Sequence, residues 1–321
     1  MVYFVSRFFI IFLLHSSVAC FAHKNPSSPK TIAITQIVSH PSLDKIRQGI
    51  LDALKKEGFY KGKNLTVIFD NAQGNVAIAL QIAQKLRGLS LDAVVGITTP
   101  SAQALASVFQ FTSVPVVFAA VTDPKMAGLH PDQLKGKVLI TGTSDFPPVA
   151  QQVALIRRVL PSARRIGVLY SVGEINAKRQ VEALKANLQP GESLVEIPVM
   201  SSSEMIFALK NSISKIDVLH IPLDNGVVAN LKVVVHTAHG ANVPVFTSHP
   251  EGVLEAGALA CIGIDQYESG YKTGELLANV LKGRSIATIP VASLTKGKAY
   301  GNAVAARLLN IRLPKELGES S

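Results

Sequence analysis

The chain has 321 residues, of which 48% are hydrophobic and 17% are charged, a globular composition that allows two modest domains. Its formal net charge is +10, but the basic residues are scattered, without a long run or interleaved aromatic residues, so nucleic-acid binding is not expected. Only two cysteines, Cys20 and Cys261, are present, which excludes a disulfide framework and leaves the fold to its hydrophobic core.

Residues 1–22 have the pattern of a secretory signal peptide. Arg7 is the one charge in an otherwise apolar start, and small residues follow. The apolar run is shorter than the about 20 residues that a membrane span needs. We therefore expect export to the periplasm, with cleavage after Ala19 or Ala22. The sequence around Cys20 also resembles a lipoprotein box without its usual Leu, so a lipid anchor at Cys20 is the alternative.

From residue 30 onward, short runs of β-branched residues alternate with stretches of helical periodicity. The strands predicted in the first half lie at 31–38, 65–69, 92–98, 114–121 and 136–145. Helices are predicted between them at 43–54, 76–87 and 102–109. The run at 136–145 is expected to leave this part of the fold.

A second series of strands and helices follows. Its strands are predicted at 165–170, 194–199, 217–221 and 243–247, and its helices at 175–188, 203–214 and 227–239. The run around Cys261 has the pattern of a buried strand, which favours a core thiol over a reactive one. The chain then closes with a helix at 266–282, a strand at 289–294 and a helix at 302–309. Strands that alternate with helices indicate parallel sheets covered on both faces.

The two series repeat each other. Asp92-Ala-Val-Val leads through a helix to Val114-Pro-Val-Val-Phe, and Asp217-Val-Leu-His leads through a helix to Val243-Pro-Val-Phe. Such a repeat favours two similar lobes over one large sheet, although βαβ units also resemble each other by chance. The expected fold class is α/β, with two Rossmann-like lobes that contain parallel sheets and are joined by a hinge. The expected lobes are 31–144 with 266–288, and 145–265 with 289–321.

The turn at 98–101 stands between a predicted buried strand and a helix. It offers hydroxyl groups and unpaired helix-start N–H groups, which suit a carboxylate or phosphate. A Thr or Ser at this place is also a common N-cap, which is the alternative interpretation.

Polar residues gather at the carboxyl ends of the predicted strands, where ligands bind in open parallel sheets. They suit a small zwitterion, with hydroxyl and N–H groups for a carboxylate and Tyr170 for an apolar body. Asp123 or Asp224 would hold the ammonium group. We expect Asp224 to do so, because Pro124 commits Asp123 to its own turn. Asp224-Asn225-Gly226 is also a common turn sequence, so a purely structural role stays open.

Enzyme signatures are sparse. The sequence has no Gly-x-Ser-x-Gly, phosphate-binding loop, His-Glu-x-x-His or Gly-x-Gly-x-x-Gly motif. His236 and His239 share a predicted helix, but no carboxylate stands beside them. We therefore predict no catalytic residue, no metal and no cofactor.

Seven short motifs occur together and in order. They are His40-Pro-Ser-Leu-Asp44, Asn71-Ala-Gln-Gly74, Thr99-Pro-Ser-Ala-Gln103, Ala120-Val-Thr-Asp-Pro124, Gly142-Thr-Ser-Asp145, Asp224-Asn225 and Gly257-Ala-Leu-Ala260. From about residue 31 to its end, the chain resembles the tryptophan/tyrosine-type substrate-binding proteins of ABC transporters, a branch of the type I periplasmic-binding fold. The resemblance implies two α/β lobes joined by three crossings, which close over a free amino acid that is typically aromatic.

The resemblance and the strand ends together give a set of candidate ligand-binding residues. They are His40, Thr99, Ser101, Thr122, Asp123, Ser144, Tyr170, Asn176, Asp224 and Asn225. Two stretches in the second lobe, 170–177 and 248–251, depart from the family pattern, so the identity of the ligand stays open.

We therefore expect an exported, monomeric solute-binding protein without enzymatic activity, which delivers an amino acid to an ABC transporter permease. The first lobe would hold the ligand and the second would swing over it. One alternative is a periplasmic enzyme or sensor of the same fold, which would need titratable groups converging on one substrate atom. Another is a sugar-type regulator, which would need a helix-turn-helix where the signal peptide stands.

Overall fold

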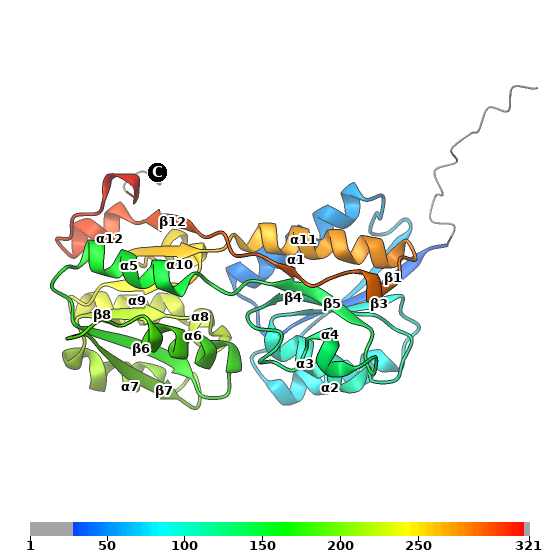
Figure 1. Cartoon of the computed structure of the whole chain (residues 1–321), viewed down its shortest axis with the longest axis horizontal. Coiled ribbons are helices and arrows are strands. Elements are labelled where there is room, and N and C mark those ends of the chain that lie inside the picture. The colour runs from blue at the N-terminus through cyan, green and yellow to red at the C-terminus, as the bar shows by residue number, and fades with distance from the viewer. Residues whose placement is uncertain (1–27, 318–321) are drawn as a thin grey trace, which may run out of the picture.

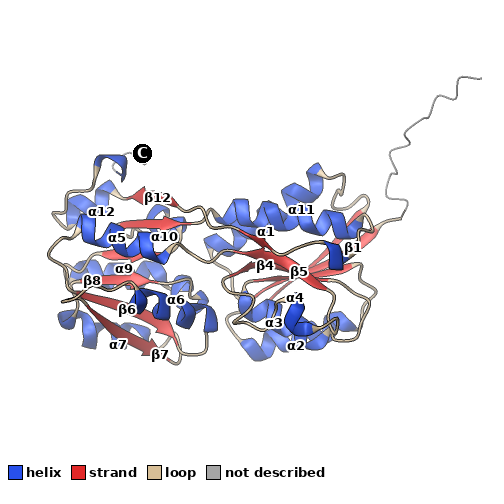
Figure 2. Cartoon of the chain, viewed as in Figure 1, coloured by secondary structure: helices blue, strands red, loops and turns tan. Residues whose placement is uncertain are grey.

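The computed structural model describes residues 28–317, so the predicted signal peptide and the lipid-anchor position at Cys20 lie outside the described residues. The described chain forms two lobes side by side, each built on a six-stranded sheet (Figure 1). Helices cover both faces of each sheet, as Figure 2 shows. The predicted α/β fold with two lobes is confirmed.

The sheet of lobe one is entirely parallel, in the strand order β11-β5-β4-β3-β1-β2. Its strands are β1 (Lys30–Gln36), β2 (Leu65–Asn71), β3 (Ala93–Ile97), β4 (Val116–Val121), β5 (Ile140–Ser144) and β11 (Ala292–Ser293). Its helices are α1 (Pro41–Lys56), α2 (Val76–Arg87), α3 (Thr99–Val108), α4 (Pro131–Leu134) and α11 (Gln266–Leu281). The β-branched runs form the strands because both faces of a parallel sheet are buried.

Helices α1 and α11 pack against each other over one face of this sheet (Figure 1). Glycines permit this close approach. A Cβ atom at Gly270 would overlap the carbonyl of Ile46, and one at Gly49 would overlap the carbonyl of Tyr267. Through helix α11, the chain thus returns to lobe one after it has formed most of lobe two.

The sheet of lobe two has the strand order β12-β10-β9-β8-β6-β7, and only β12 runs antiparallel to its neighbour. Its strands are β6 (Arg165–Ser171), β7 (Ser193–Val199), β8 (Val218–Ile221), β9 (Val245–Thr247), β10 (Ala260–Gly263) and β12 (Lys298–Gly301). Its helices are α5 (Val149–Val159), α6 (Ile175–Ala186), α7 (Met205–Ser212), α8 (Asn225–Ala229), α9 (Leu231–Gly240), α10 (Pro250–Leu254) and α12 (Ala303–Leu308). The helix predicted at 227–239 is therefore broken into α8 and α9, and β12 was not predicted.

Three segments of the described chain cross between the lobes, at 145–148, 264–265 and 294–297 (Figure 1). The last crossing comes later than the predicted boundary at 289. Ala292 and Ser293 pair with β5 of lobe one, and Ile289 is buried in the core of that lobe. Residues 289–293 thus belong to lobe one, because their apolar side chains and strand hydrogen bonds are satisfied there.

Each lobe has its own hydrophobic core. Phe118 is fully buried in lobe one and Phe246 in lobe two. Cys261 lies buried on β10 with a free thiol. Across residues 28–317, none of the helices combines the length and apolar character that crossing a membrane requires.

Candidate ligand-binding site

A cavity lies between the lobes, at the carboxyl ends of their strands. Lobe one lines it with His40, Ser42, Leu43, Thr98, Thr99, Ala120 and Thr122. Lobe two lines it with Asn176, Leu223, Asp224, Asn225, Val228 and His249. Asp145 and Gln266, which lie in or directly after crossing segments, complete the wall.

Two long helices of lobe one begin at this cavity without a side-chain cap. Helix α3 begins after Thr98 and α1 begins after His40. Within the described chain, no group accepts a hydrogen bond from the N–H groups of Thr99, Ser101, Ser42 or Leu43. The buried Thr98 Oγ1 also has no partner there. Helix starts carry positive partial charge, so this side of the cavity is suited to an anion.

The backbone is strained where lobe one meets the cavity. Thr98 has a φ of 72° and Ala120 a φ of 52°, a region that non-glycine residues rarely occupy. Ala120 lies in an irregularity between β4 and β5, and its N–H donates to Thr143 Oγ1 at 3.1 Å. Thr98 is held by its own N–H, which donates to the carbonyl of Ala119 at 2.9 Å. The neighbouring strands thus fix the turn at 98–101 before any ligand arrives.

Asp224 lines the cavity but both of its oxygens are already engaged. It accepts from the N–H and the hydroxyl of Ser171, at 2.6 and 2.9 Å, and from the N–H of Val227 at 2.9 Å. The last bond caps α8. Burial raises the pKa of Asp224. These contacts make Asp224 a support for the strand end as well as a part of the cavity wall.

Glu174 organises the neighbouring amides of lobe two. Its Oε2 accepts from the Asn225 N–H and side chain and from Asn176 Nδ2, at 2.8 to 2.9 Å. Burial and the nearby charge of Asp224 raise the pKa of Glu174 to about 8. Asn176 Nδ2 also donates to the carbonyl of Leu223. The Asn176 amide is thereby fixed, and its buried Oδ1 has no partner among the described residues.

Asp145 is a buried carboxylate on the first crossing. Its side chain is 2% exposed, and its Oδ1 finds no hydrogen-bond donor in the part of the chain that the structure describes. Burial raises the pKa of Asp145 to about 6, against a smaller opposing effect of the nearby Gln266 amide. A buried carboxylate without a cation is costly, so this position favours a ligand that carries positive charge.

Two histidines add neutral polar groups. Burial, followed by the nearby His249, lowers the pKa of His40 to about 3, so its ring is uncharged. Both His40 ring nitrogens are buried and without a partner in residues 28–317. In His249, Nδ1 accepts from the N–H of Gly252 at 3.2 Å, which leaves the proton on Nε2. That Nε2 has no partner within the described residues either, so His249 offers one N–H donor to the cavity.

The structure brings part of the predicted set together in the cavity wall: His40, Thr99, Thr122, Asn176, Asp224 and Asn225. Four other candidates lie outside the lining. Ser101 is buried within α3, and Ser144 donates to the carbonyl of Thr122 at 3.2 Å.

The remaining two candidates are held by other side chains. Tyr170 is part of the lobe-two core, and its hydroxyl donates to Glu196 at 2.8 Å. Asp123 accepts from the N–H of Met126 and forms an ion pair with Arg179 of lobe two at 3.1 Å. Asp123 therefore joins the lobes outside the cavity and is not free to hold a ligand.

The residue set predicted from the sequence missed several cavity residues, among them Asp145, His249 and Gln266. Signals for two of them are visible in hindsight. Asp145 ends the motif that begins at Gly142, and His249 stands before Pro250, in the position of a helix cap. Gln266 carries no such signal, because its place depends on how α11 returns to lobe one.

Comparison with known proteins identifies the family. The family model described as ABC transporter substrate binding protein matches residues 31–321. The chain belongs to this family. This substrate-binding protein is 38% identical over 266 residues to a tyrosine-binding protein of Clostridioides difficile (strain R20291), covering 83% of this chain and 76% of the relative. The predicted resemblance is thus confirmed.

Two solved structures of similar proteins differ in their state. One is a domain from Streptococcus pneumoniae in complex with L-Trp, with 37% identity, a TM-score of 0.84, and 90% and 97% of the two chains covered. The other is a ligand-free, open substrate binding protein with adhesive properties from Clostridium difficile, with 36% identity, a TM-score of 0.65, and 89% and 96% covered. Although the identities are nearly equal, the present chain is therefore more similar in overall structure to the L-Trp complex than to the ligand-free, open protein.

Proposed function

We propose that this substrate-binding protein captures a free aromatic amino acid between its lobes and delivers it to an ABC transporter permease. The observation that carries the proposal is the set of unpaired polar atoms in the cavity. Asp145 Oδ1 and Asn176 Oδ1 are acceptors without donors, whereas the Thr98 hydroxyl and His249 Nε2 can donate. A zwitterion supplies both kinds of partner at once.

The carboxylate of the ligand would lie against lobe one. The starts of α1 and α3 offer N–H groups there, and Thr98 adds a hydroxyl. Hydrogen bonds to a charged group contribute about 1.5–3 kcal/mol each. Because the strained turn is held by neighbouring strands, little reorganisation would accompany binding.

The ammonium group would lie against Asp145 rather than Asp224. Asp224 already accepts three hydrogen bonds, whereas Asp145 is buried without a cation. An ammonium group would neutralise Asp145, and Asn176 Oδ1 could accept a second of its N–H groups.

Support for an aromatic side chain comes from the relatives and from the apolar part of the wall. One relative is named for tyrosine and a similar solved structure contains L-Trp. The apolar lining residues are Leu43, Ala120, Leu223 and Val228. No aromatic residue of the described chain lines this cavity, so the ring would pack against aliphatic side chains.

We further infer that the protein is exported to the periplasm, acts as a monomer and has no enzymatic activity. The pattern of residues 1–22 supports export, and a lipid anchor at Cys20 remains the alternative form. The acidic residues around Asp224 are held by backbone and amide donors, which suits a binding site better than a reaction centre.

Native mass spectrometry of the purified protein, followed by calorimetry, tests this proposal. L-Tryptophan and L-tyrosine should bind, whereas tryptamine lacks the carboxylate and indole-3-propionate lacks the amino group, so both should bind at least about tenfold more weakly. Equal binding of indole-3-propionate and L-tryptophan would show that no ammonium site exists. A co-purified ligand without an amino group would also contradict the proposal.

A further inference from the structure

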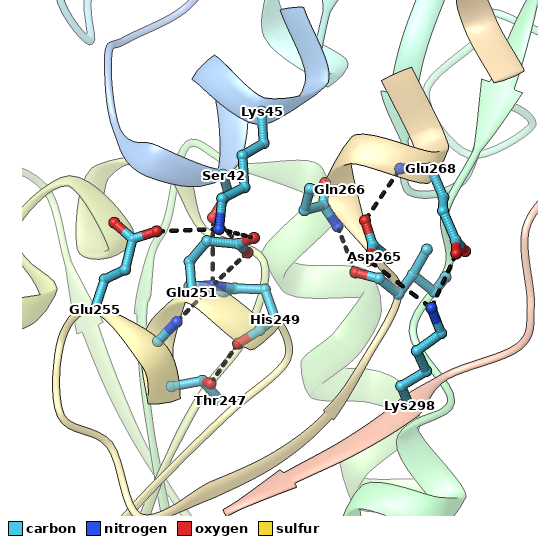
Figure 3. Close-up of polar contacts among 12 residues, drawn as sticks. Ser42, Lys45, Thr247, His249, Glu251, Glu255, Asp265, Gln266, Glu268 and Lys298 are labelled. Carbon is cyan, nitrogen blue, oxygen red and sulfur yellow. Dashed lines mark hydrogen bonds and ion pairs between the residues drawn. The ribbon is translucent and has the colours of Figure 1, made fainter. Parts of the chain in front are cut away.

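A polar cluster with a buried centre joins the two lobes beside the cavity. Figure 3 shows Ser42 and Lys45 of α1 opposite His249, Glu251 and Glu255. Lys45 Nζ lies 3.2 Å from Glu251 Oε1 and 3.1 Å from Glu255 Oε1. Ser42 Oγ donates to Glu251 Oε2 at 3.2 Å. We call these five residues the α1–α10 cluster.

Glu251 is the buried centre of the α1–α10 cluster. Its side chain is 5% exposed, but it is not among the residues that line the cavity. Burial acts to raise the pKa of Glu251, but the net shift is downward, with the Lys45 ammonium among its causes, so the side chain is ionised. Its ion-pair and hydroxyl partners, Lys45 and Ser42, both belong to lobe one, so opening of the lobes would leave Glu251 without them.

His249 connects this cluster to the cavity. It stands two residues before Glu251, and its Nδ1 lies 3.4 Å from Ser42 Oγ. Its Nε2 is buried and has no partner in the described part of the chain. The same short turn of lobe two therefore presents a donor to the cavity and a carboxylate to α1.

We propose that Glu251 is a positioning residue that couples ligand capture to lobe closure. When the lobes close, its contacts with Lys45 and Ser42 fix the start of α10 against α1 and hold the His249 Nε2–H at the ligand. Glu251 itself does not contact the ligand. This inference rests on the proposed function, because the His249 donor needs an anionic or polar ligand group to meet.

Two other ion pairs between the lobes contain no carboxylate as deeply buried as Glu251, which is 5% exposed. In the pair of Arg179 with Asp123, the side chains are 36% and 25% exposed. Lys298 and Glu268 pair at 2.9 Å beside the crossings (Figure 3), with side chains 51% and 58% exposed. Exposed pairs contribute little to stability. A buried carboxylate that loses its partner is costly by comparison, so Glu251 is the residue on which the closed state should depend.

The test compares Glu251→Gln with the matched control Glu268→Gln in the full mature protein. Since the chain contains no tryptophan, the indole fluorescence of L-tryptophan reports binding directly in stopped-flow experiments. Glu251→Gln should speed dissociation at least about tenfold while association changes less than about twofold. By X-ray scattering, it should also reduce the ligand-induced decrease in radius. Glu268→Gln should match the wild type in both measurements.

Lys45→Met is the second variant, because it removes the same ion pair from the side of lobe one. It tests the inference if Glu251→Gln does not fold. The effects of the two changes on dissociation should be less than additive in the double variant, because both remove the Lys45–Glu251 pair, although Lys45→Met also removes the pair with Glu255. The inference would be overturned if L-tryptophan dissociated from Glu251→Gln at the wild-type rate. It would also be overturned if the effects of Glu251→Gln and Lys45→Met on dissociation were fully additive. Neither result would contradict the proposed function. If the wild type itself binds neither L-tryptophan nor L-tyrosine, both proposals fail.

Discussion

Asp145 and Gln266 lie beside each other in the cavity wall, although one lies on the first crossing and the other directly follows the second. The crossings are the segments whose backbone must rotate when the lobes move. A ligand group bound at Asp145 would therefore touch the hinge itself. This placement links recognition of the ligand to the arrangement of the lobes more directly than a site within either lobe would.

The first prediction concerns Asp145→Asn. If Asp145 holds the ammonium group, removal of its charge leaves a buried cation unpaired, which costs about 2–5 kcal/mol. The dissociation constant for L-tryptophan, measured by calorimetry, should then rise about 30-fold or more. The ligand-free protein should melt at the same or a higher temperature, because a buried carboxylate without a cation has been removed. Unchanged affinity would show that another group carries this role.

The second prediction follows from the pKa of Asp145, which burial raises from 3.8 to about 6. Between these pH values the folded state retains a proton that the unfolded state has lost. The contribution of Asp145 to the free energy of unfolding should therefore fall as the pH rises from about 4 to about 6. Affinity should change in the opposite direction, since an ammonium ligand needs the ionised form, and should decline below about pH 6.

Calorimetry between pH 5 and 8 checks this dependence, because the ligand stays a zwitterion over that range. Asp145→Asn is the control, and its affinity should lack the decline near pH 6. A decline that persists unchanged in Asp145→Asn would assign the titration to a different group.

The positions of the strand ends could be predicted from the sequence more accurately than the side chains that line the cavity. Asn176, Asp224 and Asn225 could be found because parallel strands end at the same edge of a sheet. Tyr170 also follows this rule, but its hydroxyl found a partner in Glu196 within its own lobe. A local sequence pattern does not show which neighbouring residue forms a hydrogen bond with a polar side chain.

The positions of Asp145 and Gln266 depend on contacts far apart in the chain. They meet because β5 leads into the first crossing and α11 packs on α1. The late crossing after Ser293 has the same origin, since β11 is only two residues long and gains its place from pairing with β5. Such contacts are set by tertiary packing, which periodicity does not contain.

The third prediction separates two neighbouring hydroxyl groups. Thr98 Oγ1 and Ser101 Oγ are both buried without a partner among residues 28–317, but only Thr98 lines the cavity. Thr98→Val should weaken binding of L-tryptophan about tenfold, since one hydrogen bond to a charged group is lost. Its ligand-free melting temperature should not fall, because Val has a similar shape and removes an unpaired hydroxyl.

Ser101→Ala is the matched control and should bind L-tryptophan like the wild type. If Ser101→Ala weakened binding of L-tryptophan and Thr98→Val left it unchanged, the ligand would approach α3 from its other side.

The fourth prediction concerns Asp224, which the sequence suggested as the partner of the ammonium group. Its carboxylate caps α8 and holds both the N–H and the hydroxyl of Ser171. Asp224→Ala removes the cap and leaves buried donors unpaired, so it should lower the free energy of unfolding of the ligand-free protein by about 2–3 kcal/mol. Asp145→Asn should show no such loss, and denaturant unfolding of both variants measures the difference.

Asp224→Ala has a second expected effect, on Glu174. Burial and the charge of Asp224 together raise the pKa of Glu174 to about 8, so loss of that charge should lower the pKa, which carboxyl NMR can follow. If Asp224→Ala instead leaves stability intact and abolishes amino-acid binding, Asp224 is the counter-ion after all. The carboxylate of Asp145 would then serve the hinge alone. The two substitutions thus assign the ammonium site, because each acid makes a different contribution to the ligand-free protein.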